Sequence, residues 1–60
     1  IMRKTSVEFL IQSFGHNLSK MKEFIVDQEI DTVVLFDDFE IKADTFCFDI
    51  ESFVKPINLQ

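Results

Sequence analysis

The spacing of apolar residues changes near the middle of this chain, from steps of three and four residues to steps of two. Between residues 5 and 30 the apolar side chains recur at helical spacing, which places them along one stripe of a helix. They are Val7, Leu10, Ile11, Phe14, Leu18, Met21, Phe24 and Ile25. Residues 32–54 are rich in Thr, Val, Phe and Ile that alternate with polar residues, as is typical of strands. The sequence therefore predicts an α+β fold, with helix first and sheet second.

The helical half has recognisable start and stop signals. Thr5 is followed three residues later by Glu8, which matches a capping box. Gly15 interrupts the stripe, and glycine is favoured just past a helix end. Two residues could cap a second helix, Asn17 and Ser19. We expect either a helix hairpin or one helix kinked at Gly15. In a third alternative residues 6–14 form a strand, because this stretch also alternates.

A short pattern near the start of the chain consists of Met2-Arg3-Lys4, Ser6, Glu8, Leu10-Ile11 and Ser13. It resembles the opening of the Sda-type sporulation checkpoint proteins, and Glu23-Phe24-Ile25 is similar to part of their second helix. Those proteins are small helical hairpins that inhibit a histidine kinase. The resemblance covers less than half of the chain and implies a helical hairpin there, while the strand-rich second half has no counterpart in that family.

The parity of the apolar residues in the second half predicts two tight turns. Apolar residues occupy odd positions from Phe39 to Ala43 and even positions from Phe46 to Ile50. A turn at Asp44-Thr45 brings both sets onto one face, and a turn at Asp37-Asp38 pairs Phe36 with Phe39 and Val34 with Ile41. The result is a three-stranded antiparallel β-meander, with the helical segment packed on its inner face. That face is expected to comprise Val34, Phe36, Phe39, Ile41, Phe46, Phe48 and Ile50.

The same register predicts an acidic outer face. It places Glu40 opposite Asp49 and Asp38 opposite Glu51. Like charges directly across a strand pair destabilise it, so folding alone does not explain these positions. We interpret these four residues as a partner-binding face for a basic protein surface. The alternative interpretation is that the acids are simply solvated and keep the chain soluble.

Two apolar residues, Val33 and Leu35, are predicted beside this acidic face. Their outward position predicts self-association, and an edge strand could pair with a second copy of the chain. Alternatively, the C-terminal tail covers this face, with Pro56 ending any strand there. The tail residues concerned are Phe53, Val54, Ile57 and Leu59.

The length of 60 residues predicts one small domain, 1–60, that is hard to stabilise alone. A single cysteine rules out an internal disulfide, yet 47% of residues are hydrophobic and eight are Phe. We expect the excess apolar surface to be buried in a homodimer or against a target. A tightly packed monomer with a Phe-rich core is the alternative. Ile1 precedes Met2, so Met2 is the expected natural start and Ile1 a cloning residue.

The charge distribution argues against nucleic acid and membranes as direct partners. The net charge is −5, and the segment from Asp27 to Glu51 contains nine carboxylates and only one basic residue, Lys42. Such a surface repels phosphates and anionic lipid. No apolar run reaches the roughly 18 residues that span a bilayer, and no secretory signal is evident. An unpaired cysteine without a signal predicts a cytoplasmic protein.

Few residues suggest chemistry. His16 has no nearby cysteine and no serine nucleophile pattern around it, and Cys47 lacks a basic neighbour that would activate it. We predict no catalytic, cofactor or metal site, and hence no enzyme. The expected function is a small acidic protein-binding module, an inhibitor or adaptor of the kind that phages and mobile elements encode. The alternative is a homo-oligomerisation module or a small subunit of a larger assembly.

Overall fold

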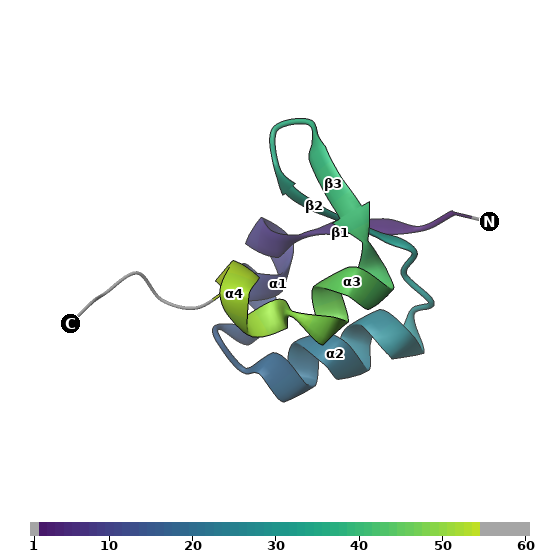
Figure 1. Cartoon of the computed structure of the whole chain (residues 1–60). Coiled ribbons are helices and arrows are strands. Elements are labelled where there is room, and N and C mark those ends of the chain that lie inside the picture. Colours follow the sequence, from purple (N-terminus) through teal and green to yellow (C-terminus); the bar gives the residue numbers. More distant parts are fainter. Residues whose placement is uncertain (1, 55–60) are drawn as a thin grey trace.

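The structure is a computed structural model that describes residues 2–54, with seven short elements in the order βααββαα (Figure 1). The strands are β1 (Lys4–Ser6), β2 (Thr32–Phe36) and β3 (Phe39–Lys42). The helices are α1 (Val7–Phe14), α2 (Leu18–Asp27), α3 (Ala43–Phe48) and α4 (Ile50–Val54). The prediction of an α+β fold is confirmed.

The first half forms two helices joined by a short turn, as one of the predicted alternatives requires. Gly15 ends α1 with φ 65° and ψ −130°, and Asn17 caps α2 by accepting a hydrogen bond from the Lys20 amide at 3.2 Å. The start of α1 differs from the prediction. Ser6, and not Thr5, accepts the capping hydrogen bond, from the Phe9 amide at 3.1 Å. In this half of the chain the strand ends at Ser6 and helix α1 begins at Val7, so the strand alternative for residues 6–14 is wrong.

The end of α2 uses a left-handed residue that is not glycine. The Ile30 amide donates to the Ile25 carbonyl at 3.0 Å, and the Glu29 amide donates to the Val26 carbonyl at 3.2 Å. This pair of bonds is the Schellman arrangement, and Glu29 adopts φ 54° to make it. The chain then turns back toward β1 and enters β2.

The sheet is mixed, so the predicted antiparallel meander is wrong. Its strand order is β1-β2-β3, with β1 parallel to β2 and β2 antiparallel to β3. Amides of Asp31 and Thr32 both donate to the Arg3 carbonyl, at 2.8 and 3.1 Å, and so bring the start of β2 against β1. Parallel strands need a long crossover, and the α1–α2 pair supplies it. This long-range pairing of a three-residue strand has no local sequence signal.

The hairpin between β2 and β3 confirms one predicted turn and corrects its register. Asp37 and Asp38 connect the strands, and Phe36 lies opposite Phe39 as expected. One residue further in, Leu35 has no partner and forms a β-bulge. Beyond the bulge Val34 pairs with Glu40 and Val33 with Ile41, whereas Val34–Ile41 was predicted. The extra residue shifts every later pair by one and reverses which of these side chains face inward.

The predicted third strand is absent, because residues 43–54 form α3 and α4. The side chains that this segment buries are Ala43, Phe46, Ile50 and Val54, which follow one another at helical steps. Phe48, expected on the inner face of a strand, is 91% exposed. The apolar residues fit both periods, and the helices bury Val54, which is not part of the predicted inner face of the sheet.

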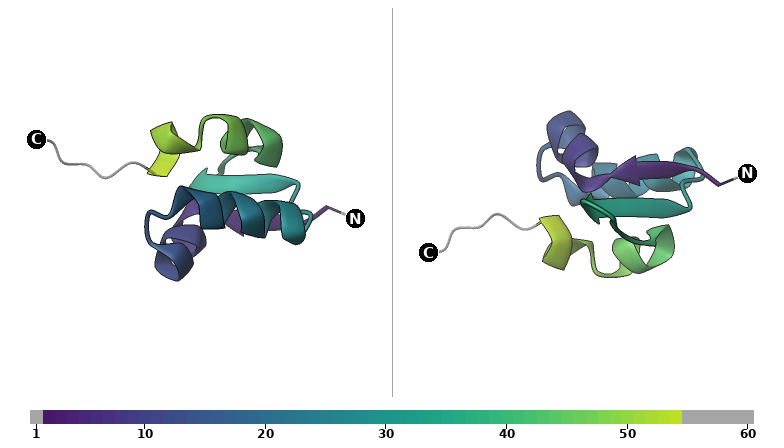
Figure 2. Two further views of the ribbon diagram at one scale, coloured as in Figure 1. Left: turned by 90° about the horizontal axis from the view of Figure 1, so that it is seen from below. Right: turned by 90° about the horizontal axis from the view of Figure 1, so that it is seen from above.

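The core lies between the helices and one face of the sheet. In Figure 1 α2, α3 and α4 lie below the strands, and Figure 2 shows β2 running between the α1–α2 and α3–α4 pairs in both views. Val33 is the fully buried strand residue, and it belongs to one core cluster with buried side chains from all four helices. Of the tail predicted to cover the sheet, Val54 is buried in this core and Phe53 packs against it. Ile1, Pro56, Ile57 and Leu59 lie outside the described residues.

Candidate functional site

The most prominent exposed feature is the end of the β2–β3 hairpin, which points away from the helices (Figure 1). We call Phe36, Asp37, Asp38 and Phe39 the aromatic tip. The two Phe rings lie 5.3 Å apart between centroids, as a tilted cross-strand pair. Phe36 is 65% exposed and Phe39 is 49% exposed. Two contacting aromatic rings thus face solvent at the furthest point of a hairpin.

Local backbone geometry produces this tip. A two-residue connection requires unusual backbone angles, and Asp37 adopts a positive φ of 45°, which Asp tolerates better than most residues. The bulge at Leu35 increases the local twist and bend of β2. Leu35 itself is half-buried against the core, so the covered part of the hairpin ends there. Among residues 2–54, no helix covers the rings beyond it.

The tip carries two exposed carboxylates, Asp37 and Asp38, beside its apolar rings. Glu40, the next acid along β3, is engaged elsewhere, since its Oε2 lies 3.1 Å from Lys4 Nζ. Lys4 and Glu40 share the outer face of the sheet, with β2 between them. The excess negative charge of the hairpin is therefore concentrated at Asp37 and Asp38.

The structure divides the four predicted acidic-face residues between two places. Asp38 lies in the hairpin turn and Glu40 on β3. Asp49 lies at the junction of α3 and α4, where its Oδ1 accepts a hydrogen bond from Ser52 Oγ at 2.9 Å, and Glu51 is in the first turn of α4. The predicted opposition of Glu40 with Asp49 and of Asp38 with Glu51 is not formed, because residues 46–50 are not a strand.

The two residues predicted for self-association are not an exposed pair. Val33 has 0% exposure and lies in the core, opposite Ile41. Leu35 is half-buried and packs against the same core. The bulge explains the error, since it turns Val33 inward where an unbroken register turned it outward. The prediction that Val33 faces outward is wrong.

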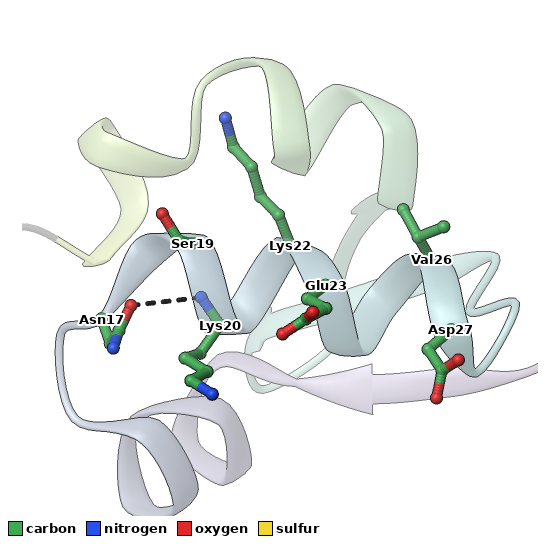
Figure 3. A pocket seen from close by; sticks show the side chains of 7 residues that line it. All are labelled: Asn17, Ser19, Lys20, Lys22, Glu23, Val26 and Asp27. Atoms are coloured by element: carbon green, nitrogen blue, oxygen red, sulfur yellow. Dashed lines mark hydrogen bonds between the residues drawn. The ribbon is translucent and has the colours of Figure 1, made fainter.

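A second surface lies along α2 and reaches toward the C-terminal helices. A shallow hollow of about 630 Å³ runs along α2 (Figure 3), with both charge signs on its walls. Lys22 extends from it toward the α3–α4 segment, where a neighbouring groove includes Phe48, Asp49 and Glu51. The charged groups of the first hollow point in different directions in Figure 3. They do not converge as the polar groups of a small-molecule site do.

Cys47 is the only cysteine, and its thiol is half-buried on α3. Burial raises the pKa of this thiol above its usual value of 9.0, Lys22 lowers it and Asp44 raises it. A raised pKa keeps the thiol protonated near neutral pH, whereas a nucleophilic cysteine needs its thiolate. The surroundings of Cys47 are therefore those of a packed side chain.

Within residues 2–54, no three His, Cys, Asp or Glu side chains are grouped so that they could hold a metal ion. Over the same range, no helix has the length and apolar character needed to cross a membrane. Comparisons with family models, curated proteins and solved structures give no match to this chain. The candidate site is thus defined by its own geometry.

Sequence patterns missed the aromatic tip because Phe36 and Phe39 were both placed on the inner face. The sequence shows that both residues flank a two-residue turn, but their exposure depends on which elements cover that end of the sheet. The strict alternation of apolar residues concealed this.

Proposed function

We propose that this chain is a small acidic protein-binding module, an inhibitor or adaptor of the phage or mobile-element type, that occludes a basic site on a target protein. The aromatic tip is the observation that carries the proposal. Phe36 and Phe39 expose apolar rings in contact with each other, and Asp37 and Asp38 flank them. Aromatic side chains that enter a pocket are the usual anchors of protein interfaces.

The chemistry of the tip specifies the kind of surface it fits. Two rings need an apolar hollow, and two carboxylates need basic groups at the rim of that hollow. A complementary rim charge chiefly raises the association rate and makes it sensitive to salt. The proposed target site is therefore an apolar hollow bordered by Lys or Arg, as on many proteins that bind anionic ligands.

The test compares variants of the chain as bait in a lysate of the organism that carries the gene. A captured protein is expected to be lost with Phe36→Ser. Phe48→Ser is the matched control, because Phe48 is a more exposed phenylalanine that lies outside the tip. The affinity of the purified pair is expected to fall by about 30-fold or more for the tip variant.

Two results would overturn this proposal. One is capture that Phe36→Ser leaves intact while Phe48→Ser abolishes it, which would move the binding surface to the α3–α4 side. The other is an affinity that does not change between low and high salt, which would mean that the target has no basic rim around the hollow.

The alternative proposal, homo-oligomerisation through Val33 and Leu35, loses its surface in this fold. Val33 is buried within the protomer, and replacing it would disturb folding before it disturbed assembly. Self-association therefore requires a different surface.

A further inference from the structure

The third strand leaves one edge of the sheet without a partner among the described residues. The strand order is β1-β2-β3, so β3 is hydrogen-bonded to β2 on one side only. Exposed edges of this kind recruit further strands. Glu40 and Lys42, the charged residues of β3, are both exposed.

The direction of the β3 backbone groups follows from the pairing with β2. The Ala43 amide donates to the Asp31 carbonyl at 2.8 Å, and Val33 pairs with Ile41 two residues further along. Hydrogen-bonded and non-hydrogen-bonded pairs alternate in antiparallel strands. Ile41 therefore directs its amide and carbonyl toward β2, while Glu40 and Lys42 direct theirs to the open edge.

We propose that β3 pairs antiparallel with the β3 of a second copy, about a two-fold axis at Ile41, to form a continuous six-stranded sheet. In this register Glu40 of each copy lies opposite Lys42 of the other. Both residues present backbone groups at the edge, so each Glu40–Lys42 pair is a hydrogen-bonded pair. Ile41 meets Ile41 of the second copy on the face that carries the core.

Charge selects this register over its neighbours. A shift by two residues in one direction places Glu40 opposite Glu40, and a shift in the other direction places Lys42 opposite Lys42. Like charges directly opposite each other destabilise a strand pair, whereas opposite charges stabilise it. A two-fold axis at Ile41 gives two opposite-charge pairs, and such self-complementary interfaces are typical of dimers.

Side chains near the axis are compatible with this arrangement. Lys4 approaches Glu40 from the far side of β2, at 3.1 Å. A carboxylate accepts several hydrogen bonds, so Lys42 of the second copy can bind the same Glu40 from the open edge. Phe39, which is 49% exposed, would lie opposite Ala43 of the second copy and lose part of that exposure.

Solution mass by light scattering, over a range of concentrations, tests the dimer, and charge exchange tests its register. Glu40→Lys and Lys42→Glu should each weaken self-association by about tenfold or more, because each places like charges opposite. Mixing the two variants should form a heterodimer, since every pair is then of opposite charge. The double variant E40K/K42E should dimerise like the parent chain. Glu51→Lys, a charge change outside β3, should leave self-association unchanged.

A backbone change separates strand pairing from general charge effects. Chemical synthesis with N-methyl glutamate at position 40 removes the outward amide and should give a monomer with unchanged circular dichroism. A monomer mass for the parent chain up to its solubility limit would overturn the inference. So would a dimer that survives N-methylation, or a mixture of the two charge variants that stays monomeric. These readouts are independent of target capture by the aromatic tip, so either proposal can fail alone.

Discussion

The ring of Phe46 in α3 stacks on the ring of Phe53 in α4, with centroids 5.6 Å apart and planes inclined by 20°. Phe46 has no exposed surface, and Phe53 packs against the same core. This contact joins two helices of only six and five residues, which are too short to be stable alone. Tertiary packing therefore holds the C-terminal segment in helical form.

Replacing Phe46 by Ala is expected to cost about 3–5 kcal/mol of folding free energy, through lost burial and the cavity left behind. A chain of 60 residues has only a few kcal/mol in total, so the variant should be largely unfolded. Phe48→Ala is the matched control, because Phe48 is 91% exposed and its loss should change stability by no more than about 0.5 kcal/mol. Urea denaturation measures both, and equal losses would favour a strand that buries both rings.

The start of α1 depends on the Ser6 hydroxyl. Ser6→Ala should cost about 1 kcal/mol, because the Phe9 amide then has no side-chain acceptor. Ser6→Asp should retain most of that stability, since a carboxylate caps equally well. Thr5→Val, which keeps the branched shape in β1 but removes the hydroxyl, should have a much smaller effect. Thermal unfolding ranks the stability of the three variants. A larger loss of stability for Thr5→Val than for Ser6→Ala would mean that Thr5, and not Ser6, caps α1.

Gly15 adopts φ 65° and ψ −130°, a backbone conformation that is open to glycine but that L-residues rarely adopt. Nothing lies within 4 Å of the position that a Cβ would occupy, so a substitution there changes backbone strain and little else. Gly15→Ala should therefore cost about 1–3 kcal/mol.

Chemical synthesis with D-alanine at this position supplies the control. The mirror image of the Gly15 conformation lies in the extended region, so D-alanine should be as stable as glycine or slightly more stable. Chemical denaturation compares the three chains. An equal loss for both alanine forms would mean that the cause is a steric contact and not backbone strain.

The raised pKa of Cys47 makes stability depend on alkaline pH. The folded state favours the neutral thiol, whose pKa lies above the value of 9.0 that applies to the unfolded chain. This contribution is fully present below pH 9.0 and is lost as the pH rises through the folded pKa, because the unfolded state then releases its proton first. The difference in unfolding free energy between the parent chain and Cys47→Ala should shrink across this range.

Lys22 provides an independent check on this titration, because its positive charge lowers the pKa of the Cys47 thiol. Lys22→Met should move the thiol titration, followed by thiolate absorbance, to higher pH. A thiol titration that does not move would mean that the charge of Lys22 does not act on the pKa of Cys47. A thiol that titrates below its ordinary value would contradict the burial of Cys47.

Several parts of the fold could be predicted because their signals are local. The stripe from Val7 to Ile25 keeps one helical period over many residues, whereas the strand-like alternation covers only residues 6–14. Gly15 and Asn17 are the residue types that end and begin helices, and they do so here. The Asp37-Asp38 turn was predictable because two turn-forming Asp residues lie between Phe36 and Phe39, which pair across the hairpin.

The candidate site was less predictable, since it depends on where the helices stop covering the sheet. Asp38 was identified, but as part of a flat acidic face that the structure divides between the hairpin and α4. Phe36 and Phe39 were assigned inward because alternation says which face a residue occupies and not whether anything covers that face. Exposure is a property of the neighbouring elements, and only their packing reveals it.

The sequence by itself determined the α+β class, the α1–α2 pair and the position of the hairpin turn, because helix period, capping and turn chemistry act between residues close in the chain. Only the tertiary structure decided that β1 pairs parallel with β2, that Leu35 bulges and that residues 43–54 are helical. A short apolar segment fits either period, and which one it adopts depends on the surface it can bury. That surface is built here by Leu10, Met21 and Val33, which are distant in sequence and meet only in the folded core.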